Sequence, residues 1–211
     1  ILAEIGSSDI GLGAIRVANA LGDKLATEFV GADILINKTA IIIDRDIKAA
    51  NGVIHEIDRV IEPISTNILE LVEANPDLSL FAEGLKKAGL SDTLSLVDFT
   101  YIEGSDKKVR TGFTLLAVPD TIFNRYGIYT IDDMVNYFTD EPNMVTDVQN
   151  GFYQFMEYHC LNGTNFLSDF NTELYPILSF NNNVLVTIDT DYRLNNNSET
   201  DTYTGFLIEQ S

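Results

Sequence analysis

The residues best able to do chemistry in this chain are its two histidines, His55 and His159, and its only cysteine, Cys160. A zinc site of the usual Cys/His type needs more such ligands than these three residues provide. His159 and Cys160 are adjacent, and neighbouring positions on a helix diverge by about 100°, so they are not expected to act together. The sequence holds no phosphate loop, dinucleotide loop or Gly-x-Ser-x-Gly nucleophile motif. No metal, no cofactor and no catalytic residue is therefore predicted.

His55 lies in a run that alternates in character, which predicts a strand with His55 on the same face as Val53 and Ile57. A catalytic histidine would need a nucleophile or an acid beside it. Asp58 is three positions further on and faces the opposite side of an ideal strand. The pattern favours a half-buried His55 that hydrogen-bonds to the backbone and ties this strand into the fold.

His159 follows Phe155 and Met156 on the apolar face of a predicted helix, so we expect a satisfied histidine in the core. An alternative from another class is a hydrolase that uses a histidine and paired carboxylates in a cleft beside an aromatic platform. The acidic stretch 189–201 offers oxygen ligands for a hard cation such as calcium, but it lacks the glycine and spacing of an EF-hand loop. A solvated hairpin loop is the favoured interpretation of that stretch.

The chain has 211 residues and a formal net charge of −19, with a sequence pI near 4.2. Such an acidic surface repels the phosphate backbone, so nucleic acid is excluded as a partner. No apolar run reaches the length of a membrane span. Hydrophobic residues make up 45% of the chain, which is enough to form a packed core. A single cysteine cannot form an internal disulfide, so the fold must be held by packing. Both ends suggest a piece of a longer protein.

Strands and turns dominate the first part of the chain. Helical spacing at Ala14, Val17, Ala18 and Leu21 predicts one short helix there. Asn51-Gly52 is the strongest turn signal in the chain and stands just before the His55 strand. The other strand predictions lie at residues 34–36, 40–43, 94–102, 113–118, 177–180, 184–188 and 203–208, with a turn at 37–38.

Helices dominate the middle. Asn67 with Glu70, and Thr130 with Asp133, have the spacing of helix N-terminal caps. A third helix is predicted after Asn75-Pro76, with a buried stripe and a stop at Gly89. A fourth runs from about 150 to 161.

The run from Asp46 to Ile61, with Asn-Gly-Val-Ile-His-Glu-Ile-Asp at its centre, resembles the second signature of the fasciclin-type adhesion domain. Residues 113–123 resemble the first signature of that domain, and Tyr158-His159 matches its internal Tyr-His pair. The resemblance implies an α+β fold, a fasciclin-like β-sandwich core with helices packed on one side.

The order of these signatures implies about one and a half units. Residues 1–65 resemble the C-terminal part of a first unit, and 66–211 resemble a second unit that lacks its closing strand. Either both units are simply truncated, or the closing strand of the first fills the open sheet of the second, within or between chains.

The resemblance implies a non-catalytic adhesion or protein-assembly module, extracellular or at the cell surface, whose partners are other surface or matrix proteins. It makes Tyr158 and His159 binding candidates, and also Asp46 and Ile47, since integrins read an Asp-Ile dipeptide in some animal members. In those members an apolar residue usually follows the Asp-Ile dipeptide, whereas Lys48 stands at that position here. A role for Asp46-Ile47 at the entry to a strand therefore stays open.

Asn51, Gly52, His55 and Asp58 are the structural signature in this interpretation. Absent disulfides and high acidity favour a bacterial surface lipoprotein, anchored in the outer membrane. In the outer membrane, the chain could alternatively serve as an accessory subunit that binds glycans or peptides for an uptake complex with a transporter. A purely structural spacer is the remaining alternative.

Overall fold

The computed structural model describes residues 3–97, 99–101, 108–110, 112–166, 169–170, 173–176, 183–186, 196–197 and 202–203. The chain divides into two compact units. Unit 1 consists of Ile1–Ser65, Asp98–Thr111 and Asn165–Phe170, and unit 2 of Thr66–Val97, Gly112–Thr164 and Asn171–Ser211.

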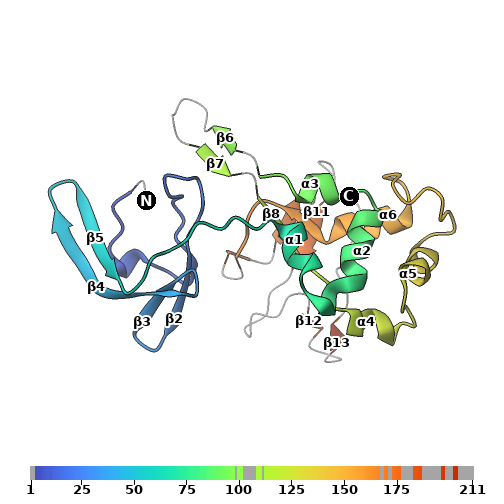
Figure 1. Cartoon of the computed structure of the whole chain (residues 1–211), viewed down its shortest axis with the longest axis horizontal. Coiled ribbons are helices and arrows are strands. Elements are labelled where there is room, and N and C mark those ends of the chain that lie inside the picture. Colours follow the sequence, from blue (N-terminus) through green and yellow to red (C-terminus); the bar gives the residue numbers. More distant parts are fainter. Residues whose placement is uncertain are drawn as a thin grey trace. The chain divides into compact units, whose positions relative to one another are not determined.

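Unit 1 is built on a five-stranded antiparallel sheet in which each strand pairs with the next one along the chain (Figure 1). A short 3-10 helix, η1 (Ser7–Asp9), precedes it. The strands are β1 (Gly13–Ala14), β2 (Ala26–Val30), β3 (Asp33–Ile36), β4 (Ala40–Ala49) and β5 (Gly52–Ile57). β5 pairs with β4 of its own unit along one of its two edges.

One face of this sheet carries the core of unit 1. Alternation along β3 and β4 buries Ile34, Ile36, Ala40 and Ile42, while their neighbours in sequence are more exposed. The predicted turn at 37–38 is confirmed: Asn37 and Lys38 have φ of 51° and 60°. Two consecutive positive φ values are those of a type I′ turn, whose twist suits a hairpin.

The hairpin of β4 and β5 contains two irregularities. Its register shifts between Ile42 and Asp44 and again between Asp44 and Ile47, so β4 has extra residues that β5 does not match. Ala49 pairs directly with Gly52, so the predicted turn is confirmed one residue earlier than the Asn-Gly pair suggests, with Gly52 as the first residue of β5.

A second hairpin belongs to unit 1, formed by β6 (Phe99–Tyr101) and β7 (Lys108–Arg110). Arg110 joins it to the rest of that unit. Its Nε lies 3.0 Å from a carboxylate oxygen of Asp23, and its backbone N–H donates to the carbonyl of Gly22 at 3.2 Å.

Unit 2 is mainly helical in its described part. Its helices are α1 (Ile68–Glu73), η2 (Pro76–Leu78), α2 (Ser79–Lys87), α3 (Ser91–Leu94), α4 (Asp120–Arg125), α5 (Ile131–Phe138) and α6 (Gly151–Tyr158). The predicted caps are confirmed at α1 and α5, where Asn67 and Thr130 each accept a bond from the backbone N–H three positions on, and Glu70 and Asp133 return it.

The core of unit 2 lies among these helices. Of the predicted stripe, Phe81, Leu85 and Ala88 are buried, whereas Leu78 lies in η2 and is half-buried. Gly89 ends the helix with φ of 77°. A short antiparallel pair, β8 (Phe113–Leu115) with β9 (Cys160–Asn162), packs against it.

The remaining described strands are two short antiparallel pairs, β10 (Glu173–Pro176) with β11 (Asn183–Val186) and β12 (Asn196–Asn197) with β13 (Thr202–Tyr203). The strand predicted over 177–180 lies outside the described residues, as do 187–188 of the strand predicted over 184–188 and 204–208 of the strand predicted over 203–208. Sheet and helices together confirm the predicted α+β class.

Several local predictions are wrong; among them, the strand expected over 113–118 ends at Leu115. The helix expected over 14–21 is absent from these described residues, because the side chain of Asn19 accepts bonds from the N–H groups of Leu21 and Asp23 and forms a turn instead. The helix expected to reach 161 ends at Tyr158, since Cys160–Asn162 pairs with β8. The strand expected over 94–102 is reduced to β6, after the helix α3.

Candidate functional site

Asp46 occupies an unusual backbone position in the β4–β5 hairpin. Arg45 and Asp46 together lie opposite the single residue His55, which makes a β-bulge, and Asp46 has a left-handed φ of 59°. Such a φ is uncommon outside glycine and costs free energy unless the surroundings hold it. Asp46 is exposed at this point.

Ser7 holds the Asp46 carboxylate. The Ser7 backbone N–H donates to one carboxylate oxygen at 2.7 Å, and its hydroxyl donates to the other at 2.5 Å. The hydroxyl bond, then the backbone bond, lowers the pKa of Asp46 from its ordinary value. Both oxygens therefore already accept a hydrogen bond within unit 1. Ser7 is 39 positions away from Asp46, so no local sequence pattern links the two residues.

His55 also connects the hairpin to the N-terminal segment. Its Nε2 lies 2.8 Å from the carbonyl oxygen of Ile5, and its Nδ1 lies 3.4 Å from the backbone nitrogen of Asp46. The tautomer with its proton on Nε2 satisfies both contacts, because Nε2 then donates and Nδ1 accepts. His55 is half-buried, as are Val53 and Ile57 on the same face of β5. This partial burial agrees with the predicted role of His55 in tying the strand to the fold.

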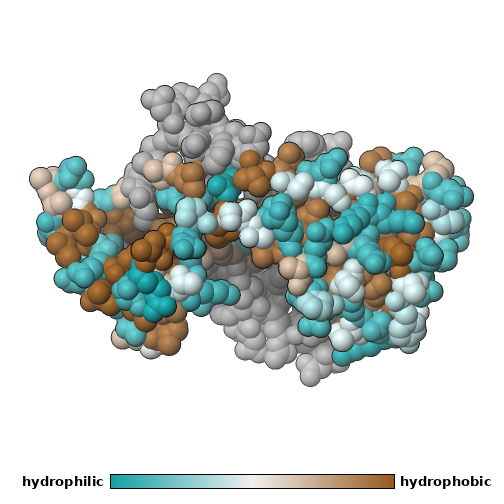
Figure 2. Space-filling view, viewed as in Figure 1, coloured by the Kyte–Doolittle hydropathy of each residue, from teal (hydrophilic) through white to brown (hydrophobic). Residues whose placement is uncertain are grey.

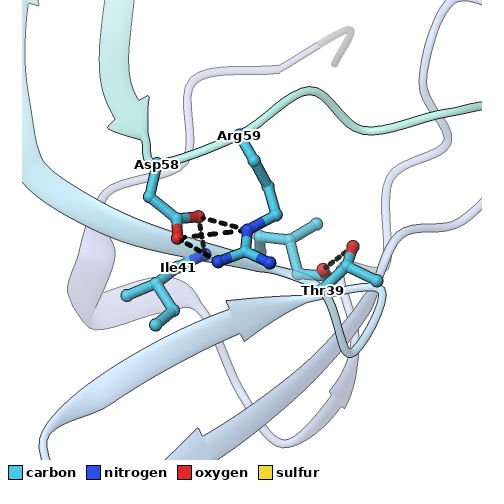
Figure 3. A network of polar contacts seen from close by, with 5 residues as sticks. Thr39, Ile41, Asp58 and Arg59 are labelled. Carbon is cyan, nitrogen blue, oxygen red and sulfur yellow. Dashed lines mark hydrogen bonds and ion pairs between the residues drawn. The ribbon is translucent and has the colours of Figure 1, made fainter.

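Asp58 holds the other end of β5 to β4 (Figure 3). Its Oδ1 accepts a hydrogen bond from the backbone N–H of Ile41 at 2.7 Å. Its Oδ2 forms an ion pair with Nη2 of Arg59, also at 2.7 Å. The Arg59 side-chain bond, then the Ile41 backbone bond, lowers the pKa of Asp58. The backbone N–H of Asp58 donates in turn to the Ile41 carbonyl at 3.0 Å. Asp58 thus closes the sheet where β5 ends.

Ile47 and Ile54 form an apolar pair on the outer face of the same hairpin. They are direct cross-strand partners, and 38% and 55% of their respective areas are exposed. Figure 2 shows hydrophobic side chains at the surface of unit 1, and Ile43 is a further exposed member. The strand alternation in the sequence puts Ile54 on the face opposite His55, a signal that could have identified this exposed pair.

Ser7, Asp46 and His55 lie near one another but are not arranged as a catalytic triad. In a triad the histidine accepts the serine proton and the aspartate orients the histidine. Here the serine hydroxyl donates to the aspartate, and the histidine Nε2 faces a backbone carbonyl. The hydroxyl proton is therefore directed to the carboxylate and not to the imidazole.

Tyr158 and His159, the other predicted binding residues, lie in unit 2 and are buried, with 7% and 6% of their areas exposed. His159 Nδ1 donates to the carbonyl of Phe155 at 2.8 Å, and its ring packs edge-on against Phe81. Burial lowers the pKa of His159 to about 4, so the imidazole is neutral near pH 7. The structure places this pair in a different unit from Asp46 and Ile47.

Two buried ionisable groups neighbour this pair. Burial raises the pKa of the Cys160 thiol to about 12, so it is not a reactive thiolate at neutral pH. Burial also raises the pKa of Glu157, which the sequence analysis did not single out.

Within the described part of the chain, no group of three or more Cys, His, Asp or Glu is placed to hold a metal ion. Of the acidic stretch 189–201 only 196–197 is described, so the calcium alternative lies outside the described residues. None of the described helices is both long and apolar enough to span a bilayer.

We expect Ser7→Ala to raise the pKa of Asp46 toward its ordinary value, because the hydroxyl bond is its largest cause of lowering. Since the folded-state pKa is depressed, the Ser7 contact stabilises unit 1 above the unfolded-state pKa of about 4, and this gain is lost as pH falls through the folded value. Carboxyl-carbon NMR titration measures the shift. Asp133, whose pKa is lowered by Thr130, is the internal control and should titrate unchanged. An unchanged Asp46 titration would contradict the assignment.

The segment that contains the β4–β5 hairpin is similar to a known protein family. Residues 3–63 match the family model described as Fasciclin domain. The rabbit (Oryctolagus cuniculus) transforming growth factor-beta-induced protein ig-h3 is 33% identical over 93 residues, which is 44% of this chain and 12% of that protein. The chain therefore spans a small part of this relative's length.

Among solved structures, a FAS1 domain pair from the insect cell adhesion molecule Fasciclin I aligns with 81% of this chain and 59% of its own. Its sequence identity is 14% and its TM-score 0.39. The family match covers the Asp46 bulge, the Asn51-Gly52 turn and both anchors of β5, and confirms the resemblance read from the sequence. Over residues 3–63, this chain is therefore similar to the fasciclin domain family.

Proposed function

We propose that this chain is a non-catalytic protein-binding module that acts in adhesion or assembly outside the cell or at its surface. Fasciclin domains serve cell adhesion and protein interaction, and residues 3–63 are such a sequence. The observation that carries the proposal is the exposed Ile47–Ile54 pair beside the Asp46 bulge. Contiguous exposed apolar patches mark protein interaction sites.

Within this function, we assign the contact role to Ile47 and a positioning role to Asp46. The Asp46 carboxylate already accepts two bonds from Ser7, whereas Ile47 leaves 38% of its area exposed. Fixing Asp46 in the bulge sets the direction in which Ile47 projects. Burial of Tyr158 and His159 supports a role for them in shaping unit 2.

We also propose that residues 1–65 and 66–211 correspond to the C-terminal part of one fasciclin unit and to a second unit without its closing strand. The change from unit 1 to unit 2 between Ser65 and Thr66 supports this division, while Asp98–Thr111 and Asn165–Phe170, from the second part of the chain, belong to unit 1. A bacterial source, an outer-membrane anchor, and glycan or transporter partners remain predictions from the sequence.

Cell attachment to the immobilised chain tests the proposal. We expect Ile47→Ser to weaken attachment about tenfold, since losing the burial of part of one isoleucine costs on the order of 1.5 kcal/mol. Ile64→Ser is the matched control, because Ile64 is also exposed and lies outside the hairpin. Equal attachment by both variants, or no attachment by the unmodified chain, would overturn the assignment.

A further inference from the structure

Among the strands that the structure describes, β5 has a partner on only one of its two edges. β5 is the last strand in the sheet order, and no other described strand pairs with its second side. Natural proteins protect such edges with lysine, proline or bulges. β5 contains no lysine and no proline, and the bulged residues are in β4. This edge lacks those protective devices.

The register of the β4–β5 pair determines which backbone groups of β5 point away from β4, toward its second edge. In an antiparallel pair, residues alternate between those that bond to the partner strand and those whose N–H and C=O point away. Gly52 closes the two-residue turn with Ala49, and the Asp58 N–H donates to Ile41, so even-numbered residues face β4. The N–H and C=O groups of Val53, His55 and Ile57 therefore face that second edge.

The side chains beside this edge have a distinct pattern on the outer face. Ile54 pairs with Ile47, and Glu56 pairs with Asp44, all four being exposed. Like charges directly opposite one another are unfavourable. Among the described residues neither Asp44 nor Glu56 has an ion pair, since the basic side chains in ion pairs contact other acids. A cation supplied from outside would relieve this repulsion.

We propose that β5 accepts an added β-strand from a partner protein, in which a basic residue lies beside Glu56 and an apolar residue two positions away lies beside Ile54. Residues two apart on a strand share one face, so a single extended segment meets both requirements. A second copy of this chain is a poorer occupant, because its charge of −19 repels another copy. This inference rests on the proposed protein-binding function and names the class of partner.

A synthetic peptide with alternating Thr and the order Lys-Thr-Ile at its centre provides the probe, added to the full chain. We expect it to slow amide hydrogen exchange at Val53, His55 and Ile57, and to leave Ile54 and Glu56, whose N–H groups already face β4, little changed. The same peptide, N-methylated on the edge that pairs with β5, keeps its side chains but loses the backbone N–H donors on that edge. We expect this peptide not to bind, because strand addition depends on those backbone hydrogen bonds.

Charge is tested separately. We expect Glu56→Gln to weaken peptide binding about two- to fivefold, which corresponds to the usual range of one cross-strand charge pair. Glu28→Gln is the matched control, because Glu28 lies in β2, away from this edge. Equal binding by the N-methylated peptide, or unchanged exchange at the three outward residues, would overturn the proposal.

Two further outcomes separate this inference from the proposed function. If the peptide does not bind while cell attachment still depends on Ile47, strand addition is wrong and the protein-binding function stands. If the three amides become protected at higher chain concentration without peptide, the occupant is a second copy, and the proposed partner class is wrong.

Discussion

Phe81→Ala is expected to destabilise unit 2 by about 3–5 kcal/mol, the usual cost of truncating a fully buried phenylalanine. Phe81 has 0% of its area exposed and packs against the ring of His159 with centroids 5.6 Å apart. Removing it leaves a cavity between α2 and the end of α6. Urea unfolding followed by tyrosine fluorescence measures the loss.

Leu71→Ala is the control for Phe81, because Leu71 is on α1 of the same unit and is mostly exposed. Its substitution should change the free energy of unfolding by no more than about 0.5 kcal/mol. A similar loss for both variants would contradict the placement of Phe81 at the centre of this core.

Gly151→Ala is the second large effect we expect, a destabilisation of about 1–3 kcal/mol by overpacking. A Cβ at Gly151 would lie 2.3 Å from the backbone oxygen of Phe138, which cannot move aside as a side chain does. The start of α6 or the end of α5 must shift to make room. Alanine's better helix propensity, about 1 kcal/mol over glycine, does not offset that shift.

Gly84→Ala gives the matched comparison, since Gly84 is also in a helix of unit 2. Its Cβ would lie 2.8 Å from Met156, at the flexible far end of that side chain. Methionine adapts readily to changed packing. We therefore expect Gly84→Ala to cost less than Gly151→Ala in thermal unfolding, and the reverse order would contradict this packing account.

Local signals in the sequence identified several elements of the fold. The pairs Asn67 with Glu70 and Thr130 with Asp133 predict helix starts because each cap joins groups only three residues apart. The alternation around His55 likewise predicts which side of β5 is half-buried.

Features that depend on distant segments escaped sequence reasoning. The bulge at Asp46 exists because two residues of β4 face one of β5, a count that only the paired register reveals. Ser7, which holds Asp46, is 39 positions away. Cys160–Asn162 continues a helical pattern in sequence, yet pairing with β8 makes it a strand.

The candidate site was predictable in part. The resemblance indicated Asp46 and Ile47, and the structure exposes both. It also indicated Tyr158 and His159, which tertiary packing buries. Sequence patterns record residue types and spacing, whereas accessibility depends on what the rest of the unit places over a side chain.

We propose that the outer face of the β4–β5 hairpin is the protein-binding surface of this chain. The most direct test is competition, in which soluble chain is added to cells attaching to immobilised unmodified chain. We expect unmodified chain and Ile64→Ser to inhibit attachment, and the double variant Ile47→Ser with Ile54→Ser to fail. Equal inhibition by the double variant would contradict the claim.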